Sequence, residues 1–164
     1  MGDGIGMLTV LLAIGLSLVA LVAVGGGLFP RPVGWTRLSA EDQAARSFLI
    51  GLVNVIFLVA LAMGAAALGE STGLGFLPII SVLLLAVLAV GATFGLMGMA
   101  ELVGERLFPG SVPLRRTLGG SAVLILACLT PYIGWFGLFP YTILRGLGAF
   151  ILGWIGSRSK PAAT

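Results

Sequence analysis

Histidine is missing from this 164-residue chain, and charged residues make up only 9% of it. A soluble domain carries about 25% charged residues and gives each surface helix a polar face. Histidine is also the commonest protein ligand for zinc and haem iron and the commonest general base. These shortages argue against a soluble fold and against chemistry centred on histidine.

Catalytic sets are lacking as well. The one cysteine, Cys128, lies in an apolar run, so we interpret it as a small buried residue without an intrachain disulfide. The chain has no G-x-S-x-G motif and no metal-ligand spacing. Acidic residues lie only at or near the edges of the apolar runs. We therefore predict a non-enzyme that holds no cofactor and no metal.

Apolar residues are abundant, at 59% of the chain, with a mean hydropathy of +1.16. The length suits one domain over residues 1–164. A helix crosses the hydrocarbon core of a bilayer with about 20 apolar residues. The sequence thus predicts an all-α transmembrane bundle of about five helices, with spans at 7–29, 47–69, 76–99, 114–130 and 141–157.

The last apolar region, 119–157, is too long to be one span. As a single helix it would measure about 58 Å, whereas the hydrocarbon core is about 30 Å thick. Pro131 and Pro140 bracket two glycines and are expected to break the helix. We predict a tight hairpin with arms that end near Thr130 and begin near Tyr141; a re-entrant hairpin is the alternative. Three aromatic residues typical of the headgroup level lie at this turn: Tyr132, Trp135 and Tyr141.

Arginine and lysine are confined mainly to three segments, at 30–46, at 100–118 and in the C-terminal tail. The loop at 70–75 contains one acid and no basic residue. Five spans with the N-terminus outside would put all three basic segments in the cytoplasm, as the positive-inside rule requires. Four spans would put the basic tail outside. We interpret the net charge of +3 as an orientation signal and not as a nucleic-acid footprint.

The segment before the second span carries a helix-start signal. Ser39 and Asp42 have the spacing of a capping box. This pattern predicts a helix that begins near Ala40, below the membrane, and continues through Arg46 into the core.

Arg145 is the single charge within an apolar run. A centrally placed arginine costs at least about 2.5 kcal/mol on insertion, so it should have a partner. The candidate partners are Glu101, Glu105, the C-terminal ends of neighbouring helices, or a lipid phosphate. The residue is then either a gating, ligand-binding or anion site, or a structural pair or snorkelling side chain. We favour the structural interpretation.

Other intramembrane residues suggest packing. Asn54 is expected to form an interhelical hydrogen bond, worth about 0.6 kcal/mol, with a substrate site as the alternative. Small residues let membrane helices approach closely. Those expected to do so are Gly91, Gly95 and Gly98 in the third span and Ala149 and Gly153 in the last helix. We favour packing within the chain, with self-association as the alternative.

Several segments are similar to the membrane portion of bacterial polymer-forming cytoskeletal (bactofilin-like) membrane proteins. They are Leu28–Pro32, Ser47–Gly51, Glu101–Leu107, Arg115 with Arg116, Pro131–Trp135 and Gly146–Ala149. The similarity covers about residues 20–157. Members of that family carry an extracytoplasmic β-rich domain before the first span, and only about six residues precede that span here. The resemblance therefore implies a fold and a location in the bacterial inner membrane, without the filament-forming role.

Two functions follow as hypotheses. The first is a structural scaffold or accessory subunit in a membrane assembly, whose partners are the lipid bilayer and either another copy of the chain or a larger complex, with no nucleic acid. The alternative is a small channel or transporter with Arg145 and Asn54 near the pathway. Helices broken by proline are a transporter feature, but the absence of intramembrane acids argues against coupling to protons or cations.

Overall fold

The computed structural model of the chain describes residues 2–130 and 132–158, and these residues form helices and no strand. The elements are α1 (Gly2–Leu28), α2 (Pro30–Asp42), α3 (Ala44–Thr72), α4 (Leu77–Leu107), α5 (Pro113–Leu129), the π-helical segment η1 (Gly134–Leu138) and α6 (Phe139–Arg158). Among the described residues, three helices are long and apolar enough to span a bilayer, or four if α1 and α2 together make one broken span. The predicted all-helical, membrane-type fold is confirmed at this level.

The basic segment at 30–46 was expected to connect two spans as a loop up to the helix start near Ala40; it is mostly helical, so that expectation was wrong. α2 follows α1 after a bend of 105°. The prolines in its first turn fit there, because that turn has no intrahelical acceptor for their missing N–H. The helix buries one face, formed by Val33, Thr36 and Ala40. Packing of this face compensates for a segment whose composition alone suggests a loop.

The predicted helix start near Ala40 was also wrong, because α3 begins at Ala44. Ser39 lies inside α2 and therefore cannot cap the next helix. Its carbonyl oxygen instead accepts the backbone N–H of Gln43 at 3.2 Å and the hydroxyl of Ser47 at 3.2 Å. The capping box, worth about 1 kcal/mol, is outweighed by the burial of α2.

The first arm of the closing hairpin ends close to the predicted place, at Leu129. The second arm does not begin near Tyr141, since η1 starts at Gly134 and leads directly into α6. The 23 residues from Gly134 to Gly156 form one candidate span. Pro131, which was expected to open the turn, lies outside the described residues.

Pro140 was expected to break a helix, and the structure shows how it is accommodated. A proline ring in an α-helix clashes with the carbonyl of the residue four positions earlier, here Phe136. That residue lies in η1, where the wider π-helical turn lengthens the backbone repeat. The helix therefore continues through Pro140 into α6.

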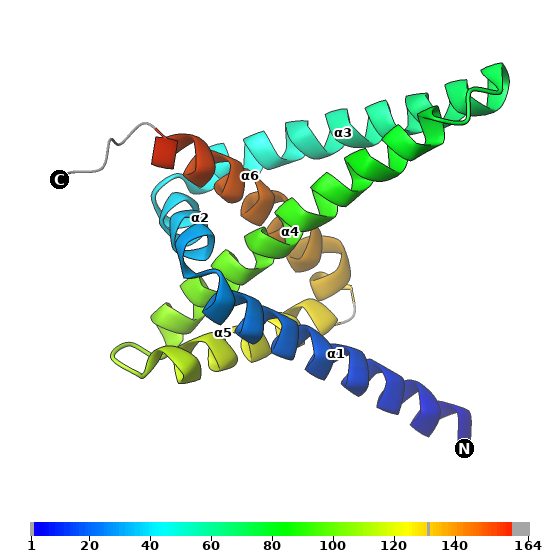
Figure 1. The fold of residues 1–164 in the computed structure, drawn as a ribbon. Coiled ribbons are helices and arrows are strands. Elements are labelled where there is room, and N and C mark those ends of the chain that lie inside the picture. The colour runs from blue at the N-terminus through cyan, green and yellow to red at the C-terminus, as the bar shows by residue number, and fades with distance from the viewer. Residues whose placement is uncertain (1, 131, 159–164) are drawn as a thin grey trace.

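α6 is the central helix and packs against α2, α3 and α4, while α1 packs against α5 and α4. Figure 1 shows α1 and the α3–α4 hairpin projecting from this bundle toward one side. α2, the α4–α5 connection and the C-terminal end of α6 lie on the other side, and the α5–α6 turn stops short of the projecting tips. With 17 residues, α5 is about 26 Å long, slightly shorter than the hydrocarbon core.

Candidate functional site

Arg145, on α6, is bound to the end of α2. Its Nη2 donates to the carbonyl oxygen of Ala40 at 2.7 Å, and its Nη1 donates to the hydroxyl of Tyr141 at 2.9 Å. Ala40 is one of the last residues of α2, where helix carbonyls lack intrahelical donors and carry the negative end of the helix dipole. Of the candidate partners considered above, the structure thus shows a helix C-terminus.

The two acids proposed as partners of Arg145 lie elsewhere. Glu105 of α4 forms ion pairs with Arg37 of α2 and with Arg116 of α5, the latter at 3.5 Å. In the part of the chain that the structure describes, neither Glu101 nor Glu105 forms an ion pair with Arg145. Glu105 therefore joins three helices, and Arg145 joins a different pair.

Both polar contacts hold α2. Arg37 and Ala40 are three residues apart, about one helical turn. Arg37 ties α2 to α4 through Glu105, and the carbonyl of Ala40 ties α2 to α6 through Arg145. α2 is thus fixed from two sides in its C-terminal half.

Asn54 does not reach another helix. Its side-chain amide donates to the carbonyl oxygen of Ile50, one turn earlier in α3, at 2.8 Å. Asn54 and Arg145 were proposed to lie near one pathway, yet each bonds to backbone, and no hydrogen bond connects them among the described residues.

The structure places the predicted packing residues of α4 against other helices. A Cβ atom on Gly95 would lie 2.4 Å from the carbonyl carbon of Gly146 in α6. A Cβ on Gly98 would lie 2.6 Å from Cγ2 of Thr36 in α2. Gly91 is buried more loosely, with 3.4 Å between such an atom and the side chain of Leu147. The backbones of α4 and α6 therefore meet at Gly95, and Gly98 leaves room for the side chain of Thr36.

The predicted residues of the last helix are buried as well. Ala149 is fully buried in a cluster with Ala40 and Met99. Gly153 faces α2, because a Cβ there would lie 2.9 Å from the carbonyl group of Trp35. Both residues bring α6 close to α2.

The sequence analysis did not predict the tightest helix contact, which joins α3 and α6. A Cβ on Gly51 of α3 would lie 1.8 Å from the carbonyl oxygen of Leu144, and one on Gly148 of α6 would lie 1.7 Å from that of Ser47. The signal available was the spacing of Ser47 and Gly51, two small residues one turn apart. α6 thus presents a glycine to each of its three main neighbours: Gly146 to α4, Gly148 to α3 and Gly153 to α2.

A second missed contact joins α4 and α5 beside the ion pairs of Glu105. A Cβ on Gly104 would lie 2.2 Å from the carbonyl oxygen of Arg116, and one on Gly120 would lie 2.1 Å from that of Ala100. These two glycines therefore allow the close approach that brings Arg116 within reach of Glu105.

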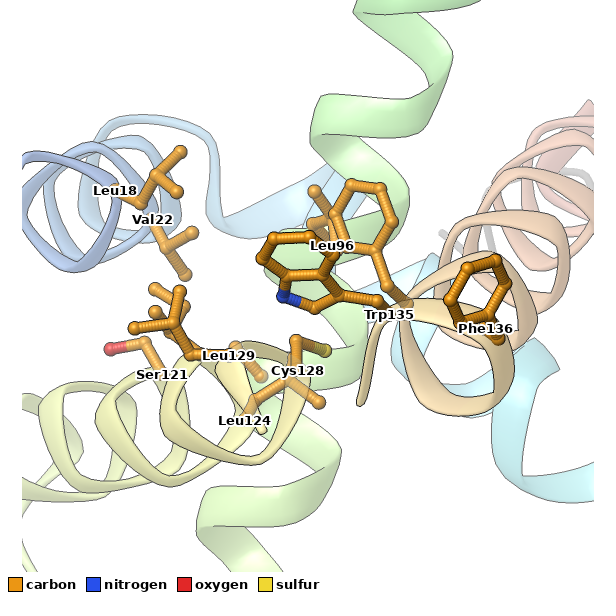
Figure 2. Close-up of a pocket in the computed structure, with 12 residues that line it drawn as sticks. Leu18, Val22, Leu96, Ser121, Leu124, Cys128, Leu129, Trp135 and Phe136 are labelled. Atoms are coloured by element: carbon orange, nitrogen blue, oxygen red, sulfur yellow. The ribbon is translucent and has the colours of Figure 1, made fainter. Parts of the chain in front are cut away.

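An apolar pocket of about 600 Å³ lies between α1, α4, α5 and η1, with the first residue of α6 also in its wall (Figure 2). Its walls are formed by Leu18, Val22, Leu96, Ala100, Ser121, Leu124, Ile125, Cys128, Leu129, Trp135, Phe136 and Phe139. No sequence pattern indicated this pocket, because its residues come from four separate segments. Cys128, interpreted above as a buried residue, is half-buried in its wall.

Comparisons with protein families, with curated proteins and with solved structures give no match to this chain. The arrangement must therefore be interpreted from its own geometry. Its charged groups and glycines join helices to one another, and the pocket between α1, α4, α5 and η1 is apolar.

Proposed function

We propose that the chain is a structural or accessory subunit of a membrane assembly in the bacterial inner membrane, without enzymatic activity of its own. The observation that carries this proposal is the exposure of the projecting hairpin formed by α3 (Ala44–Thr72) and the N-terminal part of α4, which we call the arm. Only 11% of the most apolar stretch of α3, and 17% of that of α4, is buried inside the chain. Water cannot favourably cover so large an apolar surface, so lipid or another membrane protein must.

The arm is suited to binding a partner because it is a joined pair of helices. Near its tip, Gly69 of α3 lies against the ring of Pro78 in α4. Farther along, the hydroxyl of Ser81 donates to the carbonyl oxygen of Ala62 across the pair at 2.7 Å. Such contacts hold the two outward surfaces in a fixed relation, and association between membrane helices depends on packing of this kind.

The proposal includes five membrane segments, with the N-terminus outside and the C-terminus in the cytoplasm. The segments are α1, α3, α4, α5 and the helix formed by η1 and α6. The N-terminus and the α3–α4 turn point to one side in Figure 1, opposite α2 and the α4–α5 connection. The basic residues Arg37 and Arg116 lie in α2 and at the start of α5, which agrees with the positive-inside rule.

The orientation is tested by labelling single cysteines with a membrane-impermeant maleimide in a Cys128→Ala background. Ser71→Cys, at the tip of the arm, is expected to react in intact cells. Val112→Cys, in the α4–α5 connection, is expected to react only after the membrane is permeabilised; both positions are exposed. The reverse pattern would overturn the orientation.

The subunit role is tested with a photo-crosslinking amino acid at Phe57 of the arm. Leu126 of α5 is the matched control, because the two side chains are 62% and 65% exposed. We expect the crosslinker at position 57 to give an adduct with a protein. The same protein, or a second copy of the chain, should also co-purify with the chain in mild detergent. Lipid adducts alone from the arm, together with a chain that purifies as a monomer, would contradict the proposal.

The transport alternative has its own outcome. In proteoliposomes, an Arg145→Leu variant that still folds should leave any measured solute flux unchanged if the chain is an accessory subunit. Loss of a flux that the unsubstituted chain supports would favour a channel or transporter instead.

A further inference from the structure

The apolar pocket between α1, α4, α5 and η1 lies within the part of the chain that the bilayer would surround. Its volume of about 600 Å³ is within the usual range for ligand pockets, about 300–1,000 Å³. Among the residues that the structure describes, no lysine, arginine or carboxylate lines it. An occupant must therefore be largely hydrocarbon.

Water does not suit this pocket. A buried water needs about two to four polar partners. The hydroxyl of Ser121, one of the few polar groups in the wall, already donates to the carbonyl oxygens of Thr117 at 2.8 Å and Leu118 at 3.1 Å. The remaining wall is almost entirely aliphatic or aromatic. Hydrocarbon from the surrounding bilayer is the one abundant material that matches it.

The pocket has a closed end and an open end. The closed end lies where helices cross tightly, since Gly120 lies against the carbonyl of Ala100 and Gly25 against the side chain of Met97. The open end lies at Trp135 and Phe136, both exposed. Along α5 the wall runs from Ser121 to Leu129, a length of about 12 Å. This shape fits one extended chain entering from the turn between α5 and α6.

Trp135 gives the open end a polar group. Figure 2 shows its indole directed into the pocket, with the ring nitrogen toward α5. Among the described residues, no hydrogen-bond acceptor is paired with this N–H. Tryptophan typically lies at the headgroup level, where the ester carbonyls of phospholipids provide acceptors.

We infer that this pocket binds one hydrocarbon chain of a membrane lipid, whose carbonyl oxygen accepts a hydrogen bond from Nε1 of Trp135 at the open end. The inference goes beyond the subunit role, because it requires only that the chain lies in a bilayer. The recognised chemistry is an acyl chain with an acceptor at its head end, and the headgroup charge makes no contact with the pocket wall.

The test uses tryptophan fluorescence and a brominated lipid. The chain has three tryptophans, so a Trp35→Phe, Trp154→Phe variant leaves Trp135 alone. The variant is placed in vesicles of phosphatidylethanolamine and phosphatidylglycerol, in which part of the lipid is phosphatidylcholine brominated at mid-chain. It is then extracted into detergent and washed. We expect Trp135 to stay quenched, because the pocket retains a brominated chain.

A control distinguishes a bound chain from loosely associated lipid. Phe57→Trp, made in a chain whose three native tryptophans are phenylalanine, reports on the exposed arm. Its fluorescence should recover on extraction as the surrounding lipid is lost. Full recovery at Trp135 as well, with no lipid mass on the chain in native mass spectrometry, would overturn the inference.

Filling the pocket provides a second test. Cys128→Phe adds a ring inside the wall, whereas Leu126→Phe adds one to an exposed position two residues away. We expect the first to lose retained lipid and the second to keep it. If Cys128→Phe does not fold, reaction of Cys128 in the folded native chain with an alkyl methanethiosulfonate, which leaves the alkyl group attached through a mixed disulfide and releases methanesulfinate, serves the same purpose. Lipid retention unchanged by either modification would place the lipid outside the pocket.

The hydrogen bond is tested separately with Trp135→Phe. This variant keeps an aromatic ring, smaller than the indole, and removes the donor. Lipid retention should fall by at least about fivefold, the factor given by one hydrogen bond of ordinary strength. Retention equal to that of the native chain would overturn the assignment of Trp135 as the donor.

Discussion

The contact between α3 and α6 makes the sharpest prediction about how this fold is held. In Gly148→Ala, the new Cβ would begin 1.7 Å from the carbonyl oxygen of Ser47. An ordinary carbon–oxygen contact is about 3.3 Å, so the two helices would have to separate by about 1.6 Å. Overpacking costs about 1–3 kcal/mol when side chains can adjust. Because the opposing atom here belongs to the backbone, we expect about 3 kcal/mol.

The assay is thermal denaturation of the chain in detergent, followed by size-exclusion chromatography or by circular dichroism. For a chain of this length, 3 kcal/mol corresponds to a fall in Tm of about 6–12 °C. Gly64→Ala is the matched control, because a Cβ at Gly64 of α3 would have no atom within 4 Å. Alanine also favours helix over glycine by up to about 1 kcal/mol, so this control should hold or raise the Tm.

Equal melting temperatures for Gly148→Ala and Gly64→Ala would refute the reasoning. They would mean that α3 and α6 do not approach closely enough for an alanine methyl to matter. Gly51→Ala provides an internal check, since its Cβ would begin 1.8 Å from the carbonyl oxygen of Leu144 on the same interface.

Two further predictions concern the charged residues. Arg145→Met should lower stability by about 1.5–3 kcal/mol, because it removes a charged donor from the carbonyl of Ala40. Tyr141→Phe should cost about 1 kcal/mol. Equal small losses for the two variants in the same melting assay would contradict the role of Arg145 in binding the end of α2. Glu105→Gln should lower stability by about 1 kcal/mol, because the ion pairs that it removes involve partly exposed arginines. The loss should be largest at low salt, where these pairs are least screened. Glu101→Gln should change stability by less than about 0.5 kcal/mol, since Glu101 forms no ion pair among the described residues; a larger effect than that of Glu105→Gln would refute the assignment.

Long apolar runs were the part of the fold that sequence could predict. The expected span at 47–69 lies within α3, and the span at 76–99 begins one residue before α4 and otherwise lies within it. The first arm of the closing hairpin ends at Leu129, next to the predicted Thr130. Mean hydropathy over about 20 residues is a local quantity, so no knowledge of neighbouring helices is needed.

Features that depend on distant partners were not predictable in this way. α2 is helical because α4 and α6 bury one of its faces, and its composition gives no such indication. Arg37 and Glu105 are 68 residues apart, and spacing along the chain does not relate them. The π-helical turn that lets α6 begin at Gly134 likewise depends on how the backbone adapts to Pro140.

The glycines and Arg145 act together in orienting α6. Leu144 and Gly146, on either side of Arg145, contribute the backbone atoms that meet Gly51 of α3 and Gly95 of α4. These two contacts determine how α6 is rotated about its own axis, because a helix whose backbone touches two neighbours cannot turn without a clash. The side chain of Arg145 is thereby directed to the third neighbour, α2. There its Nη2 donates a hydrogen bond to the carbonyl oxygen of Ala40, with 2.7 Å between the two atoms. An arginine that would be expensive in lipid is thus tolerated because the close contacts at Gly51 and Gly95 leave it facing a helix C-terminus.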